Sequence, residues 1–300
     1  MRVTFLGTGS TRDPRRRCAA TLVTLPDGTH VLIDTGGGNE VLLSLEAAGA
    51  DVTRIRAIIL THQHLDHAAG LPFVLFQLAM ATVRGQAVGQ VDVCAPAPAV
   101  AGLRAACETF FPGLQNPWWL ADRVRWHGCD PGDYLWRLEA RDDGTNVVIP
   151  DPALHAGQEI PDGVVAVIET MAVSHGAPPV PAQSVRIDAR HADGLTRRLV
   201  VSGDTGPNLN MSRFAAGADL LVHEAVEADA LGANPLLVLG SGHATAAIAG
   251  MVATVARARR LALHHLNART GEHPEIVRAE ASAHFAGEVL VPNDLDVIDV

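Results

Sequence analysis

The feature that most constrains this chain is a dense group of metal-capable side chains directly after a hydrophobic run. The run IRAIIL ends at Leu60, and the next ten residues, THQHLDHAAG, supply four candidate ligands: His62, His64, Asp66 and His67. Histidines two residues apart point to one side of an extended backbone, and the Asp-His pair falls where a following helix would begin. One short loop can therefore face two metal ions rather than one. With 14 histidines in 300 residues, an H-x-H-x-D-H match arises by chance in about one such chain in 500, so chance is a weak explanation.

Other metal-capable side chains follow three later hydrophobic runs. His175 follows VVAVIETMAVS, Asp204 follows RLVVSG, and His264 or His265 ends RRLALHH. Active sites of α/β proteins gather at the carboxyl ends of strands, so these side chains are expected to join the first group. Imidazole and carboxylate ligands suit zinc, and also manganese or iron.

Strand-like and helix-like segments mix along the chain. Hydrophobic runs between turn residues predict strands at 2–6, 19–25, 30–34, 54–60, 91–95, 164–174, 184–189, 198–202, 219–225 and 259–266. Longer apolar segments predict helices at 39–49, 68–83 and 244–258. This mixture predicts an α/β or α+β layered protein. No repeat, low-complexity tract or linker divides residues 1–300, so we expect one domain with an insertion around residues 85–160.

The composition excludes some classes of protein. The formal net charge is −10, which disfavours a large nucleic-acid footprint. We find no apolar run approaching the roughly 18–20 residues that cross a bilayer, and no signal peptide at the N-terminus, so no membrane partner is expected. Four cysteines at irregular spacings, without a CxxC pair, argue against a disulfide framework and a cysteine zinc site. We therefore expect a cytoplasmic protein.

One stretch is unusually aromatic. Residues 110–136 hold all four tryptophans, the single tyrosine and two of the seven phenylalanines. One interpretation is a subsidiary hydrophobic cluster beneath a long insertion. The other is a cover over the active site or a dimer surface, because aromatic side chains concentrate at binding sites, with Trp118 and Trp119 contacting the substrate. Its proline and glycine content predicts a loop-rich cover with short helices rather than another sheet layer.

These motifs together resemble the metallo-β-lactamase superfamily of hydrolases. THQHLDH is similar to the family's H-x-H-x-D-H signature, and SHG, SGDTG and LHHLN are similar to its later metal motifs, in the expected order. FLGTGS, LIDTGGG, HEAV and GHATAAIAG resemble the branch that holds ribonuclease Z, the arylsulfatase-like hydrolases and the class II cyclic-nucleotide phosphodiesterases. The resemblance covers nearly the whole chain and implies a four-layer αββα sandwich with the site at one edge of its two sheets.

The resemblance also implies ligand roles for two zinc ions per chain, with manganese or iron as alternatives. One ion would be held by His62, His64 and His175, and the other by Asp66, His67 and His265, with Asp204 bridging them. His265 is preferred to His264 because Leu266 and Asn267 follow it, as the family pattern requires. Asp34, in LIDTG, is expected to be a structural turn residue.

Catalytic roles follow from the same resemblance. Asp66 would orient the attacking hydroxide that two metal ions generate. His243, supported by Glu224, would protonate the leaving oxygen. The alternative for His243 is that it caps the helix that follows it. His223 is expected to be structural.

Differences between this sequence and the ribonuclease Z pattern narrow the range of expected substrates. That enzyme carries a Gly/Pro-rich arm for tRNA between the third-histidine motif and the GDT motif, but here His175 and Asp204 are only 29 residues apart. With the acidic charge, this favours a dinuclear metal-dependent hydrolase of a small anionic ester, a phosphodiester first and an aryl sulfate or carboxylic ester second. A ribonuclease Z-type tRNA 3′-endonuclease is the alternative, and an iron-dependent redox enzyme on the same fold is a second one. A homodimer is expected.

Overall fold

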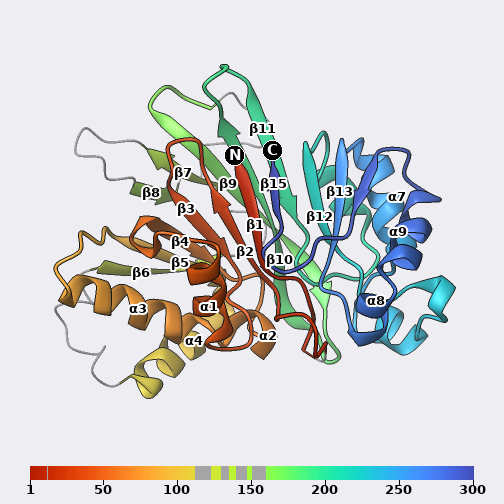
Figure 1. Cartoon of the computed structure of the whole chain (residues 1–300), viewed down its shortest axis with the longest axis horizontal. Helices are drawn as coiled ribbons and strands as arrows, with labels where there is room; N and C mark the ends of the chain where they lie inside the picture. The colour runs from red at the N-terminus through yellow and green to blue at the C-terminus, as the bar shows by residue number, and fades with distance from the viewer. Residues whose placement is uncertain (12, 112–122, 130–134, 140–146, 151–159) are drawn as a thin grey trace.

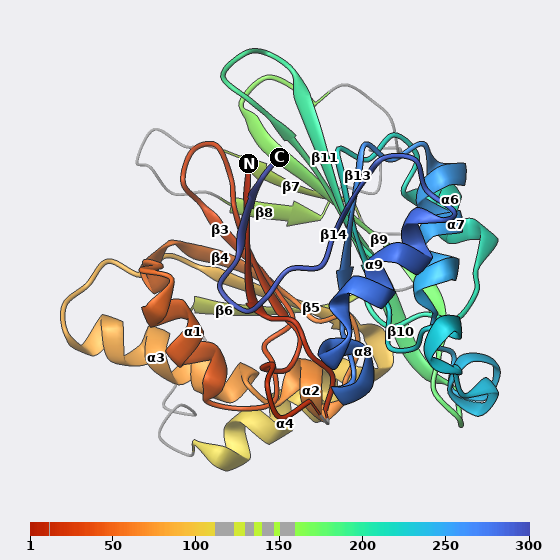
Figure 2. The ribbon, with the colours of Figure 1, turned by 45° about the vertical axis from the view of Figure 1, so that its right-hand side comes forward.

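The structure is a computed structural model of the chain. It describes residues 1–300 except 12, 112–122, 130–134, 140–146 and 151–159. Two mixed sheets face each other, with helices on both outer faces (Figure 1). The predicted four-layer αββα arrangement is therefore confirmed. Figure 2 shows the same layers after a 45° turn, with α1 and α3 outside one sheet and α7 and α9 outside the other.

The first sheet is built mainly from the N-terminal part of the chain. Within the described ranges it runs in the order β15-β1-β2-β3-β4-β5-β6, formed by Val297–Asp299, Arg2–Gly7, Ala20–Thr24, His30–Ile33, Ile55–Ile59, Val91–Pro96 and Val124–Cys129. The helices of this half are α1 Glu40–Ala47, α2 Leu65–Ala68, α3 Leu71–Val83 and α4 Ala97–Phe110, with a 3₁₀ turn at Val52–Arg54. β3, β4, β5 and β6 are parallel, so their carboxyl ends share one edge.

The second sheet carries the later motifs. Its order is β14-β13-β12-β11-β10-β9-β7-β8, formed by Glu288–Leu290, Arg260–His264, Leu220–Glu224, Thr196–Val201, Val180–Arg190, Val164–His175, Leu135–Glu139 and Val147–Pro150. Its helices are α6 Leu209–Phe214, α7 Ala246–Ala256, α8 Ala268–Glu272 and α9 Pro274–Ser282. A 3₁₀ turn at Asp229–Leu231 and a short π-helix, η4, at Leu236–Gly240 precede α7.

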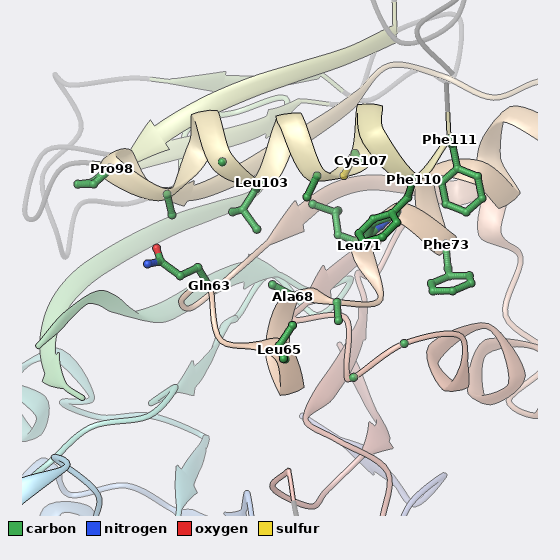
Figure 3. A pocket seen from close by; sticks show the side chains of 17 residues that line it. Gln63, Leu65, Ala68, Leu71, Phe73, Pro98, Leu103, Cys107, Phe110 and Phe111 are labelled. Atoms are coloured by element: carbon green, nitrogen blue, oxygen red, sulfur yellow. The ribbon is translucent and has the colours of Figure 1, made fainter. Parts of the chain in front are cut away.

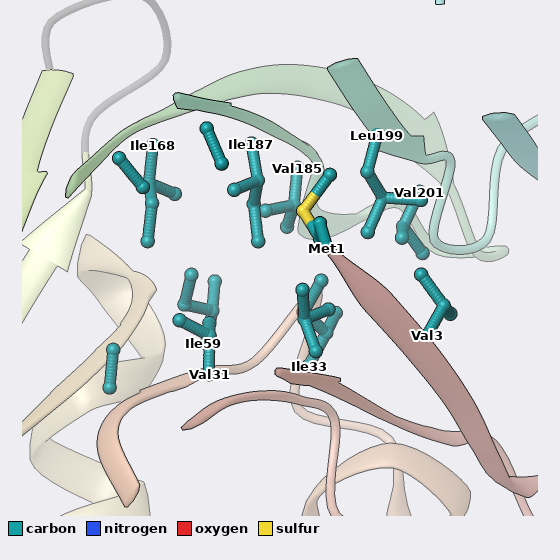
Figure 4. Packing of buried hydrophobic residues seen from close by; sticks show 14 of the residues in the cluster. Met1, Val3, Val31, Ile33, Ile59, Ile168, Val185, Ile187, Leu199 and Val201 are labelled. Atoms are coloured by element: carbon teal, nitrogen blue, oxygen red, sulfur yellow. The ribbon is translucent and has the colours of Figure 1, made fainter. Parts of the chain in front are cut away.

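Apolar side chains fill the space between the two sheets. Val31, Ile33 and Ile59 of the first sheet face Ile168 and Ile187 of the second, and all are fully or almost fully buried (Figure 4). Two further clusters lie between each sheet and its own helices. Alternate strand residues enter different clusters, because side chains alternate across a strand. The three cores are thus what the strand pattern in the sequence requires.

The aromatic stretch contains strands that we did not predict. We predicted a loop-rich cover with short helices and not another sheet layer; β6 and the start of β7 lie within this stretch and extend the two existing sheets without adding a layer, and α4 ends where the stretch begins. Trp126 lies on β6 and packs against the cluster beneath the first sheet. Trp126 therefore belongs to the hydrophobic annex that we considered as the first interpretation. Trp118 and Trp119 lie outside the described residues, so their contact with substrate stays a prediction.

The cysteine expectation was wrong in one respect. Cys94 on β5 and Cys129 on β6 form a disulfide, with their Cα atoms 6.5 Å apart. The parallel register pairs Cys94 with His127 and Pro96 with Cys129, which brings the two thiols together from positions 35 residues apart in the chain. Sequence spacing alone could not reveal this, because it depends on two strands being neighbours.

One segment has the length and apolarity of a membrane-crossing helix, contrary to our reading of the sequence. Leu65–Val83 joins α2 and α3, and its most apolar window has a mean hydropathy of 1.2. However, 61% of that window is buried inside the protein, and its Leu71, Leu75 and Leu78 pack beneath the first sheet. The segment is accounted for as a core helix.

Candidate metal centre

The first group of ligands forms where β4 and β9 end at the same edge. β4 ends at Ile59, and an extended loop carries His62 and His64 to the start of α2. His64 Nδ1 lies 2.9 Å from His62 Nε2 and 3.1 Å from Nε2 of His175, the last residue of β9. Three imidazole nitrogens thus converge on one point. Ligands about 2.0–2.1 Å from a tetrahedral zinc ion lie about 3.3 Å apart, so this spacing fits a metal ion.

The second group lies beside the first. His67 Nε2 is 3.1 Å from His265 Nε2, and His265 Nε2 is 3.3 Å from Asp66 Oδ2. Asp66 and His67 belong to α2, whereas His265 follows β13 in the left-handed conformation, with φ +56°. All three side chains are buried. A buried set of two imidazoles and a carboxylate is the donor chemistry of a second cation site.

Asp204 lies between the two groups. Its Oδ1 is 3.4 Å from His67 Nε2, and its Oδ2 is 3.6 Å from His175 Nε2 and 3.5 Å from His265 Nε2. Oδ1 is buried and has no hydrogen-bond partner. An unsatisfied buried carboxylate oxygen is costly unless a cation occupies the space in front of it. Burial alone would raise the pKa of Asp204, but the imidazoles of His265 and His67 hold it well below its usual range.

Asp34 has a role that the sequence reading missed. Its Oδ2 lies 2.7 Å from His67 Nδ1 and accepts the hydroxyl of Thr61 at 2.8 Å, while its Oδ1 accepts the Thr61 N–H at 2.7 Å. The carboxylate therefore turns the Nε2 of His67 toward the ligand cluster. Partners of this kind fix the ring orientation and the tautomer of metal-binding histidines. The sequence does place Asp34 directly after the strand β3. However, its contact with His67 follows only from the pairing of β3 with β4, which the sequence does not reveal.

Glu224 and His243 form a pair at the rim of this cluster. Glu224 ends β12, and its Oε2 lies 3.1 Å from His243 Nδ1 and accepts the Ala244 N–H at 3.1 Å. The ring of His243 packs edge-on against His175, with centroids 4.7 Å apart. Burial opposes a charge on His243, but Glu224 outweighs it and raises the pKa of His243 to about 9. The pair is thus arranged to hold a proton near neutral pH.

The helix-cap alternative for His243 is wrong. The residue that caps α7 is Thr245, whose side chain accepts the Ile248 N–H at 3.3 Å. His243 points instead into a cavity of 660 Å³ that it shares with His64, Asp66, His175, Asp204 and His265.

His264 and His223 lie away from the ligand cluster, in the interior. His264 Nε2 donates to the carbonyl of Gly7 at 2.9 Å, and burial lowers its pKa to about 3. His223 Nδ1 lies 2.8 Å from the Glu224 carbonyl, and burial lowers its pKa as well. His264 ends β13 and makes a structural hydrogen bond, whereas His265, the next residue, lies in the ligand cluster.

The far wall of the metal cavity includes residues that we did not anticipate. The hydroxyl of Thr11 donates to Asp66 Oδ2 at 2.9 Å, and Asn267 and Arg269, from the start of α8, complete the rim. Figure 2 shows α2 and α8 close together at this edge of the sandwich. Thr11 follows FLGTGS, so that motif supplies a contact to the site as well as a turn.

The chain is similar to known proteins over its whole length. A model of the metallo-beta-lactamase superfamily matches residues 13–90. Ribonuclease Z of Natronomonas pharaonis is 29% identical over 329 aligned residues, covering 100% of this chain and 98% of that protein. Ribonuclease Z of Bradyrhizobium diazoefficiens is 29% identical over 304 residues, covering 94% of each chain.

The fold is also shared with solved structures. YhfI from Bacillus subtilis, a metallo-beta-lactamase fold protein, superposes with a TM-score of 0.69 at 21% identity, covering 99% of this chain and 98% of that one. Human tRNase Z, short form, superposes with a TM-score of 0.67 at 22% identity, covering 100% and 99%.

This chain belongs to the metallo-β-lactamase superfamily. Its full-length relatives place it in the ribonuclease Z branch. The superfamily match and the His/Asp clusters at the shared edge of the two sheets support a metal-dependent hydrolase. The ligand atoms of each cluster lie within 4.8 Å of one another, so the donor set present in this chain fits that chemistry.

Proposed function

We propose that this chain is a dinuclear zinc phosphodiesterase that cleaves RNA, as its relatives named ribonuclease Z imply. The observation that carries the proposal is the Glu224–His243 pair, 3.1 Å apart, beside the ligand cluster. Cleavage of RNA expels an alkoxide, which is a poor leaving group, so a proton donor at this place has a clear purpose. Relatives with this name match the chain over its full length, which supports the same substrate class.

The side chains divide the work as follows. When bound, two metal ions would supply a hydroxide at neutral pH and neutralise charge on the transition state. His62, His64 and His175 would hold one ion, and Asp66, His67 and His265 the other, with Asp204 shared between them. Asp34 orients His67 through Nδ1.

Proton transfer is assigned to His243. Its Nδ1 faces Glu224, which leaves Nε2 as the proton donor to the leaving oxygen. Glu224 is itself fixed by the N–H groups of Thr205 and Ala244, so it cannot turn away from the imidazole. Thr11 holds Asp66 by a hydrogen bond, and Asp66 in turn would orient the attacking group.

A small phosphodiester is the second candidate, and one observation favours it. The interval from His175 to Asp204 is occupied by β10, β11 and the tight turns that join them, without an arm of the ribonuclease Z kind. The net charge of −10 also weakens attraction to RNA. An aryl sulfate or carboxylic ester would fit the same arrangement. Measurement of the bound metal distinguishes an iron-dependent redox enzyme, because about two zinc ions per chain would favour the hydrolase.

The test compares a precursor tRNA carrying a 3′ extension with bis(p-nitrophenyl) phosphate. We expect cleavage of the RNA at one site with the higher kcat/KM, and a large loss in His243→Ala. His284→Ala removes an exposed histidine from the other end of the second sheet and should retain wild-type rates. Turnover of the small ester without any RNA cleavage would replace the first candidate by the second. Absence of both activities in zinc-loaded protein would remove the proposal.

A further inference from the structure

A second large cavity lies on the other side of the H-x-H-x-D-H segment. Its volume is 670 Å³, and it opens between α4 and the α2–α3 region (Figure 3). One face of α4 lines it with Leu103, Cys107 and Phe110, and Leu71 and Phe73 line it from α3. We call it the α4 pocket. Its size is that of a small-molecule site.

The chemistry of the α4 pocket is uniform. None of the described residues that line it carries a charged side chain, and Gln63 contributes the amide among them. The thiol of Cys107 is buried, and burial raises its pKa to about 12, so it stays neutral. A charged group entering this cavity would lose hydration without gaining a partner. The pocket therefore fits an uncharged group.

Aromatic side chains define one end of the pocket. Phe111 stacks on Phe76 with centroids 4.8 Å apart and meets Phe73 at 6.0 Å in an edge-on arrangement. These contacts hold the Phe111 ring in place before any ligand arrives. Leu65 and Phe110, at 75% and 69% exposure, leave apolar surface open to water at the rim. A planar apolar ring would cover this surface and stack on the fixed aromatic wall.

The α4 pocket and the metal cavity share one wall. Gln63 and Leu65 line the pocket, whereas the intervening His64 and the following Asp66 line the metal cavity. The backbone of four residues thus separates the two cavities. Gln63 is adjacent to His64 in the chain, so the rim of the α4 pocket at Gln63 borders the metal cavity.

We propose that the α4 pocket binds the uncharged planar ring carried by the phosphodiester whose phosphate lies at the metal centre. This inference rests on the proposed phosphodiesterase function. The ring is a nucleobase if the substrate is RNA and an aryl group if it is a small diester, since both offer an uncharged aromatic face. Gln63 is the side chain placed to recognise polar edges of that ring.

Gly102 offers a clean test. It lines the pocket from α4, and a Cβ added there meets no atom within 4 Å. Gly102→Leu should fill the cavity without displacing the backbone, and it also improves helix propensity. Ala105→Leu is the matched control, because Ala105 is exposed on the same helix and does not line the pocket.

The first measurement is direct binding of N-phenyl-1-naphthylamine, a neutral aromatic probe, to the intact protein. We expect saturable binding by the wild type and by Ala105→Leu, and at least a tenfold loss of affinity in Gly102→Leu. Displacement of the probe by a short single-stranded RNA identifies a nucleobase, and displacement by bis(p-nitrophenyl) phosphate alone identifies an aryl ester. Equal probe binding by all three proteins, or displacement by neither compound, overturns the inference.

The second measurement separates this inference from the proposed function. Bis(p-nitrophenyl) phosphate and methyl p-nitrophenyl phosphate share a leaving group and differ in the second ester group. The wild type should have a lower KM for the diaryl ester, and Gly102→Leu should lose that preference with its metal content unchanged. If neither ester nor RNA is hydrolysed, the proposed function fails, while the binding result still decides whether the pocket takes a ring. An unchanged preference in Gly102→Leu overturns the inference.

Discussion

Two cavities of nearly equal volume, 660 and 670 Å³, lie on opposite sides of the segment Gln63–Asp66 and differ in the charged and metal-capable side chains that line them. The metal cavity gathers buried histidines and carboxylates from both sheets, whereas the described lining of the α4 pocket comes largely from helices and is apolar. Side chains of one short segment alternate between them. The comparison teaches that residues of the H-x-H-x-D-H segment line two cavities. The family signature names the metal-capable residues on one side only, and the residues between them, Gln63 and Leu65, line the α4 pocket.

The largest expected effect is on the metal cavity alone. Asp204→Ala removes the carboxylate that lies between the two ligand groups, so both ions should bind weakly. We expect the hydrolytic rate to fall by about 10³-fold or more, because the site loses its central electrostatic element. Metal content by mass spectrometry and kcat on bis(p-nitrophenyl) phosphate measure this, while probe binding to the α4 pocket should not change. Two tightly retained ions in this variant would remove Asp204 from its assigned place.

His243→Ala should separate proton transfer from metal binding. We expect the metal content to stay the same and the rate on RNA, with its poor leaving group, to fall by roughly 10²–10⁴-fold. The rate on bis(p-nitrophenyl) phosphate should fall much less, because p-nitrophenolate leaves without a proton. Equal losses on both substrates would show that His243 has some other role.

Asp34→Asn tests the support of one ligand. The amide cannot accept all three hydrogen bonds that the carboxylate makes with Thr61 and His67, so His67 should lose its fixed orientation. We expect zinc affinity to weaken by about 10–100-fold, as measured by competition with a chelator. Asp51→Asn is the control, because Asp51 also accepts bonds from a neighbouring threonine but is exposed and far from the site. Equal affinities in the two variants would contradict the assignment.

The smallest expected effect is that of pH on the α4 pocket, where we expect the affinity for the neutral probe not to change. Burial raises the pKa of Cys107 to about 12, so below that pH the thiol remains protonated and uncharged. Among the described lining residues it is the titratable group, so probe affinity should be constant between pH 6 and 9. Metal retention should weaken toward pH 6 over the same range, because ligand histidines must stay deprotonated. A probe affinity that falls in parallel with metal retention would mean that the two cavities are not independent.

The sequence predicted the residues of the metal cavity far better than those of the α4 pocket. His62, His64, Asp66 and His67 stand in a local motif, and hydrophobic runs before His175, Asp204 and His265 marked the strand ends that bring them together. Strand periodicity also predicted most of the central strands of both sheets. These features are local, because each ligand is marked by residues that stand next to it in the chain.

The parts that the sequence did not reveal depend on contacts between distant segments. Asp34 reaches His67 because β3 and β4 are neighbours, and Cys94 meets Cys129 because β5 and β6 pair in register. The α4 pocket arises from the packing of α4 against α3, although each apolar side chain in it looks like ordinary core in the sequence. Residues 97–110 were read as part of an irregular insertion, and the regular helix there was missed.

The most direct test of the account is a zinc titration of metal-free protein, with bound metal and phosphodiester hydrolysis followed together. The geometry of two ligand groups sharing Asp204 predicts that about two zinc ions bind per chain and that full activity requires both. Full activity with one ion per chain would contradict this arrangement. So would tight binding of a single ion whose affinity does not change when His67 or His265 is replaced by alanine.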